Sequence, residues 1–242
     1  EELYLLMLIS TLGALFMVCA DNLASFFVSL ELLSVPLYGM LAYTYARGKS
    51  LEAGFKYLIL SATASATMLM GMALIYSNTG TLSFRQIGMA IVPMFQNGMI
   101  MPILVVGTAL MLFGIAFKLS AVPFHTWTPD VYQGAPAPVA TFLGSVSKVA
   151  MMALGLRFLL STATLALPAI NTLIVVIASL SMIIGNVLAL RQHNIKRLLA
   201  YSSIAHIGYV LAIISAVKVE SAGFVSLYMA VYAFTTIGAF GV

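Results

Sequence analysis

Residues 168–190 read PAINTLIVVIASLSMIIGNVLAL, and none of these side chains carries a charge. About 20 consecutive apolar residues are enough for an α-helix to cross the hydrocarbon core of a membrane. The rest of the chain has the same character, because 62% of its 242 residues are hydrophobic and 7% are charged. Soluble proteins have roughly 45–50% apolar and 25% charged residues. The sequence therefore predicts an all-α, polytopic transmembrane helix bundle.

Charge-free stretches separated by turn residues divide the chain into about eight spans. We expect them at residues 3–20, 23–45, 51–77, 101–123, 138–160, 168–190, 195–217 and 222–242. A moderately polar connection joins the third span to the fourth. No basic segment precedes the first apolar run, so the pattern is not that of a signal peptide. Because the last apolar run reaches the final residue, we expect a fragment of a longer membrane protein.

Basic residues are concentrated on alternate connections. Arg47 and Lys49 follow the second span, and Lys196 and Arg197 follow the sixth. The opposite side has fewer basic residues, which are Arg85, Arg157 and Lys218. Since basic residues near short loops stay cytoplasmic, we place the first group, with Glu1 and His125, on the cytoplasmic side of the inner (plasma) membrane. This asymmetry also explains the net charge of +4 without a nucleic-acid partner.

Four ionisable residues lie well inside expected spans, away from the span ends: Glu31, Lys118, Lys148 and His206. A charge at the bilayer centre costs about 2.5–3.5 kcal/mol on insertion scales, so such residues usually face a protein interior or a water-filled path. Each has a structural alternative. Glu31 can be a neutral carboxyl bonded to a neighbouring helix, Lys118 can extend its ammonium to the surface, and His206 can be a hydrogen-bonded core residue. Lys148 has no such escape, because about 15 Å of helix separates it from its entry side.

The segment KLSAVPFHTWTPDVYQGAPAPV, residues 118–139, interrupts the fourth span. Pro123 removes one helical donor and clashes with the carbonyl four residues earlier. Discontinuous helices of this kind form ion sites in transporters. The alternative is an ordinary loop that places Trp127 and Tyr132 in the interfacial belt. Two faces at helical spacing add polar groups, which are Ser202, His206 and Tyr209 in the seventh span and Tyr228, Tyr232 and Thr235 in the eighth.

Three strings resemble the antiporter-like membrane subunits of respiratory complex I. They are SLELLSVPLYGMLAY (residues 29–43), FKLSAVPFHTWTPDVYQGAPAPVATFLGSVSKVA (117–150) and NIKRLLAYSSIAHIGY (194–209). The resemblance implies an antiporter-like fold of inverted five-helix repeats, each with a broken helix. Residues 1–160 would form the first repeat, and residues 161–242 would begin a second, truncated repeat. The family's glutamate–lysine pair would fall on Glu31 and Lys118, and its central lysine on Lys148.

The resemblance also implies a division of labour within a proton-translocating NADH:quinone oxidoreductase. This chain would move protons, bind no cofactor and contact other membrane subunits and the lipid bilayer. NADH, FMN, iron–sulfur clusters and quinone would bind to other subunits. Cys19 is the single cysteine in the sequence, so no cysteine-ligated cluster is expected here. The three histidines, His125, His193 and His206, give no spaced pair for axial haem ligation.

A proton route follows as a hypothesis. An ordinary lysine, with a pKa of about 10.4, keeps its proton at pH 7, and burial disfavours the charged form. A carboxylate about 6 Å away stabilises the ammonium by roughly 2.8 kcal/mol at an effective dielectric of about 20. Movement of Glu31 would therefore switch Lys118 between holding and releasing its proton. Lys148 would receive that proton through hydrated polar groups, with His206 as a candidate relay.

Two other classes compete with this interpretation. A stand-alone sodium–proton antiporter subunit would share the Glu31 and Lys118 pattern, although the VYQGAPAP string, residues 131–138, argues against it. A purely structural membrane scaffold would not need Lys148 at the middle of a span.

Overall fold

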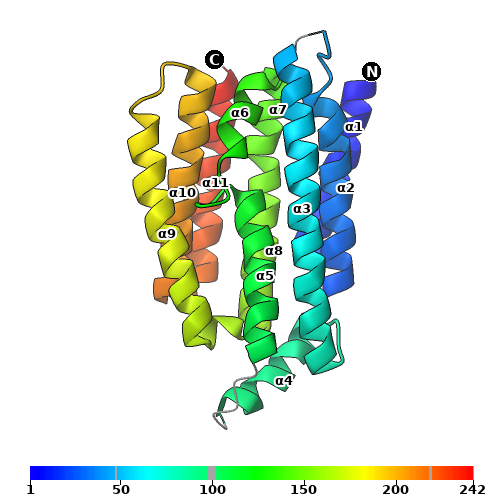
Figure 1. Cartoon of the computed structure of the whole chain (residues 1–242), viewed down its shortest axis with the longest axis vertical. Helices are drawn as coiled ribbons and strands as arrows, with labels where there is room; N and C mark the ends of the chain where they lie inside the picture. The colour runs from blue at the N-terminus through cyan, green and yellow to red at the C-terminus, as the bar shows by residue number, and fades with distance from the viewer. Residues whose placement is uncertain (47, 97–101, 218–219, 242) are drawn as a thin grey trace.

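The computed structural model describes residues 1–46, 48–96, 102–217 and 220–241. They form a bundle of long helices whose axes run nearly parallel (Figure 1). The first helices are α1 (Glu2–Cys19), α2 (Leu23–Leu41), α3 (Gly48–Thr79), α4 (Phe84–Gln96) and α5 (Pro102–Leu119). The others are α6 (Trp127–Gly134), α7 (Ala137–Gly144), α8 (Val146–Ser161), the short 3₁₀ helix η1 (Thr164–Ala166), α9 (Pro168–Ala189), α10 (Ile195–Val217) and α11 (Ser221–Gly241). The prediction of an all-helical bundle is confirmed.

Within the described residues, eight segments are long and apolar enough to cross a membrane. They agree with the eight spans expected from the sequence. The end of the bundle that carries α6 and the start of α10 is called the upper end below, and the end that carries α4 the lower end (Figure 1).

The connection between the third and fourth spans contains a helix that the sequence analysis did not predict. Helix α4 lies at the lower end, and its Phe84, Ile87 and Ile91 are buried against the bundle. Their spacing of three and four residues is that of one helical face. A Cβ atom at Gly88 would lie 2.4 Å from the carbonyl oxygen of Ser161, so α4 packs directly on the end of α8. From the sequence we expected only a moderately polar connection here.

The predicted discontinuity is present, but the helix ends earlier than expected. Helix α5 ends at Leu119, because Ser120 adopts a left-handed conformation with φ of 65°. The chain resumes as α6 at Trp127, and their connection lies within the bundle (Figure 1). The fifth span has a second interruption at Ser145, where α7 gives way to α8.

Glycines allow two pairs of helices to approach closely. A Cβ atom at Gly71 on α3 would lie 2.7 Å from the carbonyl oxygen of Gly107 on α5. On α9, a Cβ atom at Gly185 would lie 2.8 Å from the backbone nitrogen of Ala205 on α10. Small residues let membrane helices pack backbone against backbone. The α3–α5 and α9–α10 pairs are therefore tightly packed.

Candidate functional site

Two lysines lie in the interior of the bundle. Lys118, at the end of α5, is 7% exposed, and Lys148, near the start of α8, is fully buried. The Lys118 ammonium bonds to hydroxyls of neighbouring helices and does not extend to the surface. Burying an ammonium is costly unless polar groups compensate it. The groups around each lysine therefore determine whether its ammonium form is stable in the interior.

Hydroxyl groups from two helices surround the Lys118 ammonium. Its Nζ donates to Ser34 Oγ on α2 at 2.7 Å and to Ser61 Oγ on α3 at 2.6 Å. Tyr38 Oη lies 2.9 Å from the same Ser61 Oγ, and the Tyr57 ring centre is 5.7 Å from Nζ. An ammonium has three donors, and two are satisfied by these serines. All of the hydrogen-bond partners named here are neutral.

Glu31 is held by the same helix, α3. Ser65 Oγ donates to Glu31 Oε1 at 2.7 Å, and the glutamate is partly buried. No ion pair within 4.0 Å joins Glu31 to Lys118 in the described part of the chain. The two charges are instead connected through Ser65 and Ser61, which lie four residues apart and thus about one turn along α3. This arrangement keeps the carboxylate close to the ammonium without direct contact.

The backbone of the break is satisfied by protein groups. Ala121 N donates to the Ala116 carbonyl at 2.7 Å, and Trp127 Nε1 donates to the Phe117 carbonyl at 3.2 Å. The Val122 N–H binds Ser181 Oγ on α9 at 2.9 Å. Irregular backbone at membrane depth needs such partners. The loop alternative is wrong for the aromatic residues: Trp127 and Tyr132 are both buried instead of lying in an interfacial belt.

Within the described residues, the Lys148 ammonium makes one hydrogen bond to a side chain. Its Nζ donates to Ser203 Oγ on α10 at 2.7 Å, and the Tyr132 ring centre lies 5.8 Å away. Ser203 Oγ in turn donates a hydrogen bond to the Ala200 carbonyl at 2.8 Å. A cation over an aromatic face is worth about 0.5–2 kcal/mol. Tyr132 and Ser203 therefore supply most of the compensation that the structure offers to this ammonium.

A polar cavity of about 160 Å³ opens beside Ser203. Its walls come from α6, α10 and α11 and carry hydroxyl and imidazole groups, including those of Tyr132, Ser202, Ser203, His206, Tyr232 and Thr235. A water molecule needs about 10–15 Å³ of such volume and two to four polar partners. The cavity therefore has the size and the chemistry to hold several waters.

The two polar faces expected on α10 and α11 meet at this cavity. His206 Nδ1 lies 2.7 Å from Tyr228 Oη, and Tyr232 Oη donates to the Gly144 carbonyl at 3.0 Å. Tyr209 points elsewhere and accepts a hydrogen bond from Asn186 at 3.0 Å. His206 is thus a hydrogen-bonded residue at the cavity wall, and its role as a relay stays a prediction.

A charged cluster at the upper end was missed by sequence reasoning. Asp130 on α6 accepts from Lys56 Nζ at 3.0 Å and from Arg197 Nη1 at 2.6 Å. Lys56 also binds Glu52, and Arg197 binds Gln133. Burial raises the pKa of the Asp130 carboxyl, but the two cations outweigh it and hold the pKa below its ordinary value. The partners are 67 and 74 residues from Asp130, so no local spacing signals this contact.

The described residues contain no group of three or more His, Cys, Asp or Glu side chains arranged to hold a metal ion. Cys19 is exposed and unpaired. The chemistry available in the interior is therefore that of lysines, a carboxylate, an imidazole and hydroxyls, which are groups that accept and donate protons.

This fold and these buried groups are those of an antiporter-like transmembrane protein. Residues 20–242 match the family described as NADH:quinone oxidoreductase/Mrp antiporter, TM, and the chain belongs to this family. It is 63% identical over its whole length to NADH-quinone oxidoreductase subunit N of Psychrobacter arcticus and 54% identical to that of Acinetobacter baumannii. It spans 48% of each of these relatives, about half of their length. The resemblance to complex I membrane subunits is confirmed.

Solved structures give the same result. The chain is 38% identical to a chain of respiratory complex I from Thermus thermophilus, with a TM-score of 0.85, and covers 51% of it. It is 29% identical to a chain of the archaeal membrane-bound sulfane sulfur reductase, with a TM-score of 0.86 and 47% of that chain covered. A chain of the Mrp complex from Dietzia, at 24% identity and a TM-score of 0.87, shares the fold.

Proposed function

We propose that this chain forms about half of a proton-translocating membrane subunit of an NADH–quinone oxidoreductase, corresponding to subunit N. Its identity to that subunit in three bacteria supports the assignment. The observation that carries the proton-transfer role is Lys148, a fully buried ammonium bonded to one serine beside a polar cavity. A permanently charged lysine at this position would be costly, whereas one that releases its proton is not.

In the proposed route, two lysines hold the proton in turn. Glu31 sets the charge state of Lys118, because moving the carboxylate away from the ammonium reduces their attraction. The Ser65 and Ser61 hydroxyls lie between these groups and provide alternative hydrogen-bond partners. Lys148 then takes up the proton and passes it toward the cavity, where His206 is a candidate relay. The roles of Glu31, Lys118, Lys148 and His206 are all part of this proposal.

The domain division and the orientation belong to the same proposal. Residues 1–160 would be one five-helix repeat, and residues 161–242 the start of an inverted second repeat. The cytoplasmic side would be the upper end, because the cluster of Lys56, Lys196 and Arg197 is there. Arg47 and Lys218, which also entered the charge count, lie outside the described residues.

The redox chemistry would be carried out elsewhere. NADH, FMN, iron–sulfur clusters and quinone would bind to other subunits, and this chain would contact the neighbouring membrane subunits and lipid. The chain would thus act as a non-redox part of the enzyme and convert changes at its neighbours into proton movement.

Proton pumping by the whole complex in liposomes tests the assignment. Lys148→Ala and Glu31→Gln should each reduce NADH-driven acidification of the lumen to less than half, in complexes with normal subunit content. A control, Lys49→Ala, changes a basic residue near the upper surface and should leave pumping within about a fifth of the original rate. Full pumping in both interior variants would contradict the proposed route.

A stand-alone sodium–proton antiporter is the second candidate, because the matching family includes Mrp antiporters. Reconstitution of the full-length protein without redox partners separates the two. Sodium-dependent proton exchange that Lys148→Ala abolishes would favour the antiporter, whereas activity only in the assembled, NADH-supplied complex favours the proposed function.

A further inference from the structure

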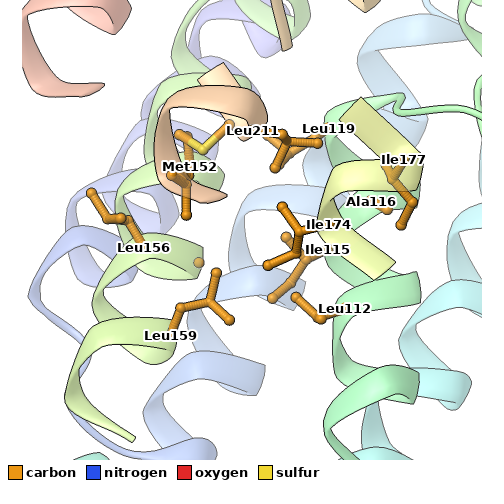
Figure 2. A pocket seen from close by; sticks show the side chains of 12 residues that line it. Leu112, Ile115, Ala116, Leu119, Met152, Leu156, Leu159, Ile174, Ile177 and Leu211 are labelled. Carbon is orange, nitrogen blue, oxygen red and sulfur yellow. The ribbon is translucent and has the colours of Figure 1, made fainter. Parts of the chain in front are cut away.

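A second cavity lies on the lower side of the two lysines. It has a volume of about 30 Å³ and is enclosed by α5, α8, α9 and α10 (Figure 2). Leucine, isoleucine, methionine, alanine and glycine residues make up its wall, among them Ile115, Met152, Leu156, Ile177 and Leu211. Figure 2 shows these side chains pointing toward one another from the four helices. The wall contains no polar side chain.

The volume of this cavity would admit water, but its chemistry would not retain it. About 10–15 Å³ suffices for one water molecule, which also needs two to four hydrogen-bond partners. Most of the wall lies within helices, where backbone groups bond to one another, and the Ala116 carbonyl near the end of α5 accepts from Ala121 N. Apolar cavities of this type stay dry. The space therefore separates the helices without offering a path for a proton.

The apolar layer extends beyond the cavity. Four helical segments that surround it carry only apolar residues: 109–117 on α5, 149–156 on α8, 173–178 on α9 and 210–214 on α10. On α8 this segment separates Lys148 from Arg157 by eight intervening residues, which correspond to about 13 Å of helix. No side chain in it can accept or donate a proton.

The upper side of Lys148 is different. The polar cavity of about 160 Å³ lies toward α10 and α11, and the Asp130 cluster lies at the upper end. Polar groups therefore approach the buried lysine from one side, and an apolar layer closes the other.

We propose that this apolar layer of α5, α8, α9 and α10 is a proton barrier that closes the lower side of Lys118 and Lys148. The inference rests on the proposed proton-transfer function and adds a specific role for residues that carry no polar group. A proton held by either lysine then cannot pass directly downward through this layer. Polar groups placed in the layer supply partners for water and open a leak toward the lower end.

A matched pair of substitutions on α9 tests the barrier. Ile177 lines the cavity and is 5% exposed, whereas Ile183 on the same helix is 63% exposed on the outside of the bundle. In the whole complex in liposomes, Ile177→Asn should speed the passive decay of an imposed pH gradient at least threefold. Ile183→Asn introduces the same amide outside the layer and should leave the decay unchanged. NADH oxidation should continue in both variants, with the pH gradient reduced only in Ile177→Asn.

Two further variants keep the test informative. If the larger asparagine side chain prevents assembly of the complex, Ile177→Ser replaces it in the test. A serine hydroxyl can bond to a carbonyl of its own helix, so it should disturb the packing less. For the same reason we expect a smaller leak from Ile177→Ser than from Ile177→Asn. Adding both Lys118→Ala and Lys148→Ala to the leaking variant should return the decay to the original rate, because the leak runs through these two lysines.

Passive decay needs no redox chemistry, so it separates the two proposals. If the original complex fails to pump but Ile177→Asn still leaks through the two lysines, the proposed function falls and the barrier stands. Equal decay in assembled Ile177→Asn, Ile177→Ser and Ile183→Asn complexes would overturn the barrier. A leak that is unchanged when both lysines are replaced by alanine would overturn it as well.

Discussion

Glu31 and Lys118 carry opposite charges on α2 and α5, and each binds a serine of the helix between them. Ser65 donates to the Glu31 carboxylate at 2.7 Å, and Ser61 accepts from the Lys118 ammonium at 2.6 Å. An attraction of roughly 2.8 kcal/mol at about 6 Å falls by half when the separation doubles. Because neutral hydroxyls hold both groups, small movements of α3 can change this energy without breaking a direct ion pair.

Removing the Ser65 hydroxyl should therefore weaken the control of Lys118. Ser65→Ala leaves the Glu31 carboxylate without this partner, and a lost hydrogen bond to a charged group costs about 1.5–3 kcal/mol. We expect NADH-driven pumping by the whole complex to fall severalfold, with Ser65→Thr close to the original. Ser77→Ala is the matched control, because Ser77 is exposed on the same helix and bonds only to neighbouring residues of α3. Equal pumping in Ser65→Ala and Ser77→Ala would contradict this role.

The Tyr132 ring and the Tyr132 hydroxyl should contribute differently. The ring centre lies 5.8 Å from Lys148 Nζ, whereas the buried Oη has no hydrogen-bond partner among the residues that the structure describes. Tyr132→Phe keeps the ring and removes only a hydroxyl at the wall of the polar cavity, so thermal stability in detergent should be nearly unchanged. Tyr132→Leu removes a cation–π contact of about 0.5–2 kcal/mol and leaves a poorly filled core, so the Tm should fall by several degrees. The reverse order of the two Tm values would show that the hydroxyl is the important group.

The sequence predicted the spans and the ionisable residues well because both are local signals. A charge-free run identifies a span, and Lys148 stands out within one whatever surrounds it. Contacts between distant segments could not be predicted in this way. Asp130 meets Lys56 and Arg197 only because α6 folds back between α3 and α10. The distinction between a buried and an extended Lys118 likewise depended on Ser34 and Ser61, which reach it from other helices.

Helix α4 was missed for a related reason. Its polar residues lowered the hydrophobicity of the interval, and only the spacing of Phe84, Ile87 and Ile91 distinguishes it from a loop. An amphipathic helix that lies against the end of a bundle has no long apolar run, so a search for spans does not detect it.

Close packing of α3 on α5 predicts a strong effect of one methyl group. A Cβ atom at Gly71 would lie 2.7 Å from the Gly107 carbonyl oxygen and 2.9 Å from Met111 N, which are backbone atoms. Gly71→Ala should therefore push the helices apart at a cost of about 1–3 kcal/mol, lowering the Tm and disturbing the site at Lys118. Gly223→Ala on α11 is the control, because nothing lies within 4 Å of its Cβ position. Alanine favours a helix over glycine, so that variant should be as stable as the original or more so.

The charged cluster at the upper end predicts a pH dependence of stability. Asp130 lies on α6, outside the eight candidate spans, and its pKa in the folded chain is lower than its ordinary value because Arg197 and Lys56 outweigh the effect of burial. A carboxyl with a depressed pKa stabilises the folded state above its unfolded pKa, which is about 3.9, and this contribution is lost as the pH falls through the lower, folded pKa.

Asp130→Asn should therefore lower the Tm at pH 6–7. The difference in Tm between the variant and the original protein should shrink progressively below about pH 4. The effect should be small, because partly exposed ion pairs are worth about 0–1 kcal/mol each. Tm measurements in detergent across this pH range, at low and high salt, follow the difference between the two proteins. Glu52→Gln is the control, because Glu52 binds Lys56 on its own helix and does not join α3 to α6. Since the Asp130 carboxylate binds cations on both α3 and α10, a difference that stays constant from pH 7 down to pH 3 would mean that its charge does not hold α6 in place.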